Sequence, residues 1–308
     1  MATVSVLMAT YKEEKQQLSQ AIESILNQTY QDFEFIIILD NPKNEEHIKL
    51  IEDYKENDPR IIFSINEENM GLSKTLNKAI TLATGEYICR MDADDISEPY
   101  RISEQLKYLK ENHYDLVGGL STMIDEDGGV IYKIKSVPTD FSKIKKLLRY
   151  NQVISHPTWF GKKGVFEELN GYRLIPLCED YDFTLRAVLK GFRISNLNKN
   201  VLNYRMTRGS ISRSNLFDQY LFQCYITKQY SKGKIADIQE AISFVNNHSD
   251  KKKRQIYLAA NEIFNNVLKN IQEKKYCKLV VNCVKLIFSS KYYLNKIYRL
   301  YRVSKGAN

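Results

Sequence analysis

The sequence has few of the residues that hold disulfide-bonded or zinc-dependent folds together. Its five cysteines are odd in number, scattered and without a CxxC pair: Cys89, Cys178, Cys224, Cys277 and Cys283. This pattern argues against a disulfide framework or a zinc site, and it predicts free thiols in a reducing compartment.

Long apolar runs and glycine-rich loops are also missing. No stretch approaches the ~20 apolar residues that cross a bilayer, and the short segment Thr3–Ala9 leads directly into the charged residues 12–14. We therefore expect a cytoplasmic chain without a signal peptide. Neither GxGxxG nor GxxxxGK[ST] occurs among the 13 glycines, which argues against a dinucleotide or P-loop site.

The composition is otherwise that of a soluble globular protein, with 43% hydrophobic and 27% charged residues over 308 positions. The charge is distributed unevenly. Residues 1–204 contain 25 Lys and Arg against 31 Asp and Glu, a net charge of −6, whereas residues 205–308 contain 20 against 6, a net charge of +14. This asymmetry predicts two regions with different tasks.

Short apolar runs alternate with helical patterns through the first hundred residues. The expected strands are Val4–Ala9, Phe35–Leu39, Ile61–Phe63 and a run that begins at Tyr87, and helices are expected near residues 18–26, 45–56 and 72–83. Such alternation predicts an α/β fold whose parallel sheet is wound by right-handed crossovers.

Acidic side chains follow the fourth of these strands. Asp92, Asp94 and Asp95 come directly after the apolar run, and Asp92 and Asp94 share a face of extended backbone. Crowded carboxylates repel one another unless a cation offsets their charge. A hard divalent ion, Mg²⁺ or Mn²⁺, bound by carboxylates and substrate phosphates meets that need. The alternative is a solvated acidic turn before a helix that starts at Pro99.

Polar residues also stand at the ends of the first two strands, at Thr10, Tyr11, Glu13 and Asp40. The carboxyl ends of parallel strands form the sheet edge at which open α/β sheets bind ligands. Together these residues predict a nucleotide pocket in which Tyr11 stacks on the base and Asp40 accepts its imide N–H. Taken singly, Tyr11 is equally well a surface aromatic residue and Asp40 a turn residue.

The order of these motifs resembles that of the family-2 glycosyltransferases. The resemblance extends over residues 3–205 and rests on Val4–Glu13, residues 24–30, Asp40, residues 69–71 with Asn77, and residues 85–95. It implies the GT-A fold, an α/β fold with a mostly parallel, Rossmann-like central sheet. It also implies a nucleotide-diphosphate sugar as donor and inversion at the transferred carbon.

The resemblance assigns roles to individual residues. Those implied to bind the nucleotide sugar are Thr10, Tyr11, Glu13, Asp40, Gly71, Lys74, Asn77, Asp92 and Ala93. Asp92 and Asp94 form the DxD motif, which holds the ribose and the metal bound to the diphosphate, Mn²⁺ or Mg²⁺.

Asp180 is the candidate general base. It stands with Glu179 at the start of a predicted helix and matches the Glu-Asp motif of the family. Inverting transfer needs one carboxylate to take the proton from the acceptor hydroxyl as it attacks opposite the leaving group. The alternative is that both acids only stabilise the helix N-terminus.

Candidates for acceptor or diphosphate contacts are His156, Trp159, Glu179, Arg205 and Arg208. His156 is equally compatible with a backbone hydrogen bond beside Pro157, and for Trp159 a place in the core is favoured. Arg208 follows the last strand, where many relatives carry a histidine, and is expected to contact the diphosphate.

The middle of the chain predicts further elements. They are a helix over Pro99–Asn112, a strand over Leu116–Gly119, a hairpin joining Thr122–Ile124 to Val130–Lys133, a helix near residues 143–148, and strands over Phe192–Ser195 and Val201–Arg205. We expect a catalytic domain over residues 1–213, which binds the nucleotide sugar through residues 1–96 and the acceptor through residues 97–213.

Residues 214–308 are expected to form a basic helical region. Cys277–Phe288 is apolar except for Lys278, Asn282 and Lys285, and Tyr292–Arg302 combines tyrosines with Lys and Arg. Such helices suit the interface of an anionic membrane. The alternative is that the apolar stripe packs on the catalytic domain. No nucleic-acid-binding motif is present.

These expectations combine into one hypothesis. The chain is a metal-dependent enzyme at the cytoplasmic face of the plasma membrane that transfers a hexose or N-acetylhexosamine from a UDP-sugar. The acceptor is a saccharide, linked to polyprenyl diphosphate, in capsule, O-antigen or cell-wall polysaccharide assembly. The alternatives are a dTDP-rhamnose-dependent rhamnosyltransferase and a non-catalytic sugar- or lipid-binding protein on the same scaffold.

Overall fold

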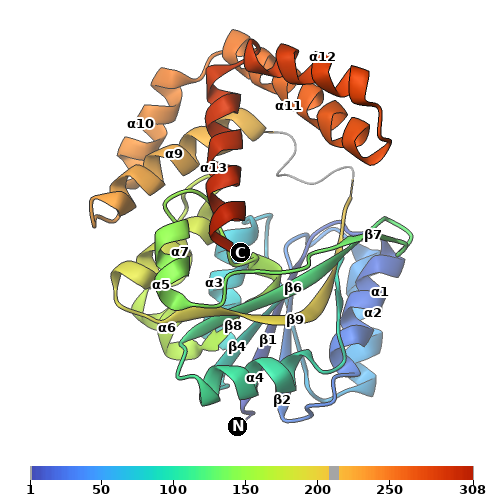
Figure 1. The fold of residues 1–308 in the computed structure, drawn as a ribbon. Coiled ribbons are helices and arrows are strands. Elements are labelled where there is room, and N and C mark those ends of the chain that lie inside the picture. Colours follow the sequence, from blue (N-terminus) through green and yellow to red (C-terminus); the bar gives the residue numbers. More distant parts are fainter. Residues whose placement is uncertain (1, 208–214, 308) are drawn as a thin grey trace. The chain divides into compact units, whose positions relative to one another are not determined.

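A computed structural model of the chain describes residues 2–207 and 215–307 (Figure 1). They belong to two compact units. The first comprises Met1–Lys146, Gln152–Leu174 and Glu179–Arg208, and the second comprises Leu147–Asn151, Ile175–Cys178 and Gly209–Asn308. The sequence did not suggest that the two short segments around residues 149 and 176 belong to the second unit.

The first unit begins with the alternation that the sequence predicts. Its elements are β1 (Val4–Thr10), α1 (Lys15–Leu26), β2 (Phe33–Leu39), α2 (Glu45–Asn57), β3 (Ile61–Ile65), α3 (Leu72–Leu82) and β4 (Tyr87–Asp92). The four strands are parallel and lie in the order β3-β2-β1-β4. Every residue of β2 is buried, because a strand covered by helices on both faces needs a continuous apolar run rather than alternation.

The second part of this unit extends the sheet. It contains β5 (Ile96–Ser97), α4 (Arg101–Glu111), β6 (Leu116–Ile124), β7 (Val130–Lys133), α5 (Phe141–Leu147), the 3₁₀ helix η1 (His156–Thr158), β8 (Phe160–Lys162), α6 (Lys163–Glu168), α7 (Glu179–Leu189) and β9 (Ile194–Arg205). Within the described residues the sheet has nine strands and continues from β4 in the order β8-β6-β9-β5, with β7 paired to β6. The sheet is therefore mixed, because β8, β5 and β7 pair antiparallel with their neighbours.

Two predicted interruptions are absent. The two strands expected over residues 192–205 are a single strand, β9, and it pairs in parallel with β6, which itself runs through Gly118 and Gly119 to the predicted hairpin (Figure 1). Asn196, the first residue after the predicted strand Phe192–Ser195, is buried within β9. Asn196 donates to the carbonyls of Pro138, at 2.9 Å, and Val153, at 3.0 Å. The hairpin of β6 and β7 is confirmed.

The second unit is helical. Its helices are α9 (Leu216–Ser231), α10 (Ile238–His248), α11 (Lys251–Gln272), α12 (Tyr276–Ile287) and α13 (Lys291–Ala307). Tyrosines build much of its core: the ring of Tyr257 lies 5.1 Å from those of Phe217 and Tyr293. The Tyr293 hydroxyl donates to Asn261 at 2.8 Å, so a buried ring keeps its polar end satisfied. Among the residues described here, no helix has the length and hydropathy to cross a bilayer.

Candidate active site

The site forms at the carboxyl edge of the parallel strands. Thr10 at the end of β1 is paired with Leu39 at the end of β2, and Ala9 is paired with Asp92 at the end of β4. The three strands therefore end side by side, and the loops that follow them converge on one place, as the sequence predicts.

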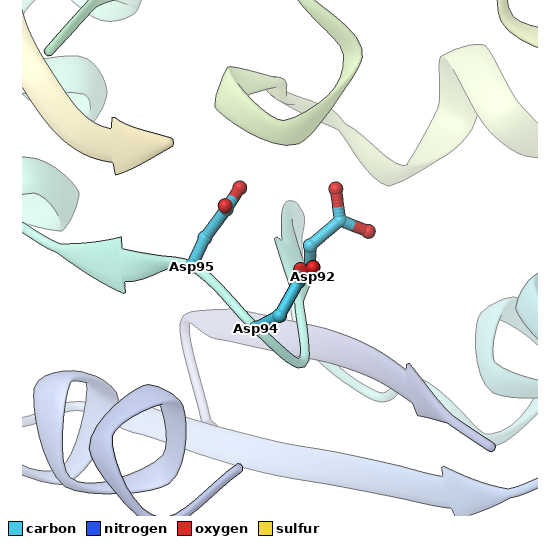
Figure 2. Close-up of side chains that lie close together, drawn as sticks. All are labelled: Asp92, Asp94 and Asp95. Carbon is cyan, nitrogen blue, oxygen red and sulfur yellow. The ribbon is translucent and has the colours of Figure 1, made fainter. Parts of the chain in front are cut away.

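Three carboxylates lie together on the turn between β4 and β5 (Figure 2). Asp92, Asp94 and Asp95 each offer one oxygen, and these oxygens lie within 4.8 Å of one another. Asp95 is fully buried; its Oδ1 accepts from the backbone N–H of Arg205 at 2.8 Å, and its Oδ2 has no partner among the described residues. A buried, unpaired carboxylate oxygen is costly unless a cation or donor meets it.

The carboxylates of this turn repel one another, and a bound cation would offset their charge. Burial, followed by the charges of Asp92 and Glu13, raises the pKa of Asp94 to about 7. Burial, followed by the charges of Asp92 and Asp94, raises the pKa of Asp95 well above its ordinary value. Mn²⁺ and Mg²⁺ prefer carboxylate oxygens, so the cluster of Asp92, Asp94 and Asp95 fits the predicted divalent metal.

Arg90 is a buried cation beside the acidic turn that the sequence did not single out. It lies on β4 with 3% of its surface exposed, and its Nη2 is paired with Asp92. Its Nε and Nη1 are buried and have no partner among the described residues. Its charge acts on a wide set of titratable groups: Asp94, Asp95, His156, Tyr172, Glu179, Asp180 and Tyr204. Arg90 is thus a buried positive charge that is paired with Asp92 and helps to lower the pKa of Asp94, Asp95, Glu179 and Asp180.

Asp180 and Glu179 begin helix α7 and lie within the field of Arg90. Burial raises the pKa of Asp180, and hydrogen bonds from the Tyr181 backbone and the Gln152 side chain partly offset this rise. Burial, followed by the charge of Asp180, also raises the pKa of Glu179. A carboxylate with a raised pKa is a stronger base than an exposed one, which suits proton abstraction near neutral pH.

Asp182, one helical position beyond Tyr181, has a different environment. It accepts from Arg173 at 2.5 Å and from Arg186 at 2.8 Å. Its charge is therefore neutralised inside the fold, and its role is structural.

The loop after β1 is shaped by Glu13. Its Oε2 accepts from the Thr10 hydroxyl at 2.6 Å and from the Tyr11 backbone N–H at 2.8 Å. Thr10 is buried, whereas the Tyr11 ring is 38% exposed. Thr10 and Glu13 thus fix the loop, and Tyr11 is the exposed member of this group, with the Lys12 ammonium 5.8 Å from the centre of its ring.

Asp40 ties the end of β2 to the start of α3. Its Oδ1 accepts from Asn66 at 2.7 Å and from the Met70 N–H at 2.8 Å, and its Oδ2 accepts from the Gly71 N–H at 2.8 Å. Gly71 adopts a φ of +80°, which a glycine reaches without strain. Both oxygens of Asp40 are engaged within the protein, so a base imide would share an oxygen with these donors. Lys74, on the first turn of α3, is exposed.

Trp159 lies in the core, the place that the sequence favours, and Asn77 is hydrogen-bonded within the fold. Trp159 is completely buried and stacks on Tyr172 with ring centroids 6.2 Å apart, so it belongs to the core and cannot stack on an acceptor sugar. Asn77 accepts from the Tyr172 N–H and donates to the Tyr172 carbonyl, both at 2.8 Å. Its side chain therefore anchors the Tyr172 backbone, and its contact with the donor stays a prediction.

His156 is part of the same aromatic cluster. Its Nε2 lies 2.8 Å from the Tyr172 hydroxyl and its ring is 4.6 Å from that of Trp159. Burial and the charge of Arg90 lower the pKa of His156 well below its ordinary value. The neutral form is therefore favoured, and the residue is 9% exposed with its Nε2 bonded to the Tyr172 hydroxyl.

Arg205 fastens the acidic turn and does not reach outward. Its Nε donates to the Asp94 carbonyl at 2.7 Å, its Nη1 to the Glu126 carbonyl at 2.8 Å and its Nη2 to Gln20 at 2.7 Å. The expected diphosphate contact of Arg205 is therefore wrong, because its donors are used in holding the turn. Ala93 is buried inside this turn. Arg208 lies outside the described residues.

Residues 5–169 match the sequence profile described as Glycosyl transferase family 2. This match covers more than half of the chain. The chain belongs to glycosyl transferase family 2. The GT-A fold predicted from the resemblance is confirmed by its similarity to solved structures.

This family-2 glycosyltransferase is similar in sequence and in fold to known proteins. It is 37% identical over 216 residues to the O-antigen biosynthesis glycosyltransferase WbnJ of Escherichia coli, covering 69% of this chain and 83% of that protein. Its fold is similar to that of residues 1–349 of Staphylococcus aureus TarS in complex with UDP-GlcNAc, with a TM-score of 0.60, 20% identity, and coverage of 79% and 70%.

A second solved structure covers more of the family-2 chain. The mannosyltransferase PcManGT of Pyrobaculum calidifontis, in complex with GDP-Man and Mn²⁺, is similar with a TM-score of 0.59 at 15% identity, covering 94% of this chain and 88% of that one. At these identities the two structures establish the fold alone.

Proposed function

We propose that this family-2 glycosyltransferase transfers a hexose or N-acetylhexosamine from a UDP-sugar, with inversion, to a saccharide acceptor in polysaccharide biosynthesis. One observation carries the proposal. The buried guanidinium of Arg90 is paired with Asp92 of the acidic turn, and its charge also helps to lower the pKa of Asp180 at the start of α7. We infer that one site combines a cluster of potential metal ligands with a carboxylate of raised pKa, and inverting transfer needs both.

The roles follow from the environments. Asp180 takes the proton from the acceptor hydroxyl as that oxygen attacks the anomeric carbon opposite the diphosphate. Asp92, Asp94 and Asp95 would hold Mn²⁺ or Mg²⁺, and the ion would supply charge stabilisation for the departing diphosphate. Lys74 is exposed at the start of α3, where it adds positive charge on the donor side. Tyr11 stacks on the base.

The nature of donor and acceptor is inferred from similar proteins. The name of the Escherichia coli relative assigns it to O-antigen biosynthesis, and TarS was solved with UDP-GlcNAc. We infer an acceptor linked to a lipid diphosphate, at the cytoplasmic face of the membrane. The strongly basic sequence after residue 204 supports this placement, because it is attracted to an anionic lipid surface.

The test is a donor panel. The full chain is incubated with UDP-glucose, UDP-galactose, UDP-GlcNAc, GDP-mannose or dTDP-rhamnose, with Mn²⁺ or Mg²⁺, and nucleotide release and product anomeric configuration are measured. We expect release with a UDP-sugar and an inverted product. If nucleotide is released only from dTDP-rhamnose, the donor is dTDP-rhamnose and not a UDP-sugar. Nucleotide binding without release from any donor would favour the non-catalytic alternative.

A further inference from the structure

Helix α12 of the second unit exposes an apolar face. Its members, with their exposed fractions, are Tyr276 (68%), Val280 (62%), Val281 (52%), Val284 (50%), Ile287 (57%) and, at the helix end, Phe288 (84%). They recur at intervals of three and four residues and therefore form one stripe. A contiguous apolar surface of this kind marks an interaction site, whereas single exposed apolar residues do not.

The exposed stripe remains after α12 has packed within its own unit. A different set of residues, Leu279, Cys283 and Leu286, faces inward, and Leu286 is 6% exposed. The helix thus has a buried apolar face and a second apolar face that nothing covers among the described residues. Folding of the helical unit alone does not account for the second face.

A basic groove lies beside the stripe, between α11 and α12. It has a volume of about 500 Å³ and is lined by the lysines Lys269, Lys275, Lys278 and Lys285, the asparagines Asn266, Asn270 and Asn282, and a single acid, Glu273. Glu273 is paired with Lys275 at 2.6 Å and with Lys269 at 3.9 Å. Lys278 and Lys285 form no ion pair within the described ranges, so their charges are available to an anion.

The sequence around α12 has charge of one sign only. From Lys274 to the last residue there is no Asp or Glu, and the basic residues are Lys274, Lys275, Lys278, Lys285, Lys291, Lys296, Arg299, Arg302 and Lys305. An apolar stripe flanked by unpaired lysines is the arrangement of a helix that lies in the surface of a membrane.

We propose that α12 lies in the surface of an anionic phospholipid bilayer, with the stripe from Tyr276 to Phe288 among the acyl chains and with Lys278 and Lys285 on the phosphate groups. The charge selects this occupant. A second copy of the chain would bring the same lysines face to face in a twofold contact, and like charges oppose such an interface. A lipid surface supplies the opposite charge to every lysine at once.

This inference deepens the membrane placement in the proposed function and names the surface that makes it. It can fail separately from that function. The groups assigned to transfer lie in the first unit, whereas α12 lies in the second. Nucleotide release measured without vesicles therefore tests the chemistry, and vesicle binding tests α12.

The first experiment places a reporter on the stripe of the full chain. The only tryptophan, Trp159, is completely buried and gives a constant background, so Phe288→Trp adds one exposed indole. We expect its emission to shift to shorter wavelength with vesicles of phosphatidylglycerol and phosphatidylcholine, and not with phosphatidylcholine alone. Ile131→Trp on β7, where Ile131 is 51% exposed, is the matched control and should not shift.

The second experiment measures vesicle binding by flotation. Exchanging Lys278 and Lys285 for Gln should weaken binding about fivefold for each residue, roughly twenty-five-fold together, and Phe288→Ser should weaken it about tenfold or more. The pair Lys55→Gln and Lys107→Gln, on exposed helical positions of the first unit, has the same charge change and should have little effect. All variants should release nucleotide at the wild-type rate in water.

Two outcomes would overturn the proposal. One is equal binding of wild type and the Phe288→Ser variant to anionic vesicles. The other is a concentration-dependent dimer in sedimentation velocity that Phe288→Ser abolishes, with no vesicle binding by the wild type. The second outcome would assign the stripe to a second copy of the chain.

Discussion

Arg90 and Asp92 form an ion pair between alternate residues of one strand, β4, with the guanidinium buried and the carboxylate at the sheet edge. Side chains two positions apart on a strand share a face, so the strand itself aligns the pair. Asp92 is therefore both the ion-pair partner of Arg90 and a member of the carboxylate cluster of the acidic turn.

Removal of Arg90 should destabilise the fold strongly. Arg90→Gln leaves the carboxylates of the turn without their counter-charge, and breaking a buried pair costs about 3–5 kcal/mol. Arg254→Gln is the matched control, because Arg254 pairs with Asp218 at 2.8 Å but its side chain is 53% exposed, and it should cost about 1 kcal/mol or less. Urea unfolding of the metal-free chain measures both. Equal stability of the two variants would contradict this assignment.

Asp180→Asn should abolish turnover and leave the fold intact. We expect a rate reduction of about 10²–10⁴, the usual contribution of a general base, with unchanged unfolding and nucleotide binding. Asp182→Asn, in the same helix, should instead lower the stability of the fold more than it lowers the turnover rate. It disrupts the pairing with Arg173 and Arg186, so stability falls first. A fully active Asp180→Asn variant would move the base elsewhere.

The rate should fall on the acid side of the pH profile at a pH above the ordinary titration of aspartate. Burial raises the pKa of Asp180, and the base works only when it is deprotonated, so the rate is high above the raised pKa and is lost as pH falls through it. Turnover at saturating donor and metal, followed from pH 5 to pH 9, measures this limb. Asp180→Glu should shift the limb, and an unchanged profile would exclude Asp180 as its origin.

Metal removal should make stability depend on pH through Asp94. Its pKa of about 7 in the folded chain lies above the value near 3.9 of an unfolded aspartate, so the folded state holds the proton more tightly. This contribution is complete below about pH 3.9 and is lost as pH rises through about 7. The melting temperature of the metal-free chain should therefore fall between pH 5 and pH 8, and Mn²⁺ should restore it most at pH 8.

Asp94→Asn is the control for that experiment. It removes the repelling charge, so the metal-free variant should be more stable than wild type at pH 8 while it loses stabilisation by Mn²⁺. If Mn²⁺ does not change the melting temperature of the wild-type chain at pH 8, the metal assignment is wrong.

The first four strands could be predicted because each is a continuous apolar run followed by a polar residue, and burial on both faces requires that pattern. The three-residue strand β8 was missed, because so short a segment has no periodicity of its own and is defined by its neighbours β4 and β6. The loop expected in β9 was wrong for a related reason: whether Asn196 ends a strand depends on distant carbonyls that accept from it.

In the site, residue type predicted the acidic turn, the resemblance to the family singled out Asp180 as a candidate, and hydrogen-bond partners that the sequence does not reveal decide the surroundings of the other residues. Arg205 looked like a diphosphate ligand, but its partners include Gln20, 185 positions away, and no local pattern reveals such a contact. The importance of Arg90 could have been predicted from the sequence. A lone arginine inside a buried strand needs a counter-charge, and Asp92 stands two positions further on.

The three hydrogen bonds that Asp40 accepts have a consequence for engineering nucleotide preference. The same carboxylate that the base would meet also sets the entry angle of α3, through Met70 and Gly71. An exchange at this position therefore changes loop geometry and selectivity together, and the two effects cannot be tuned independently. We expect that base preference is altered more readily at Lys43, which is exposed and three positions after Asp40.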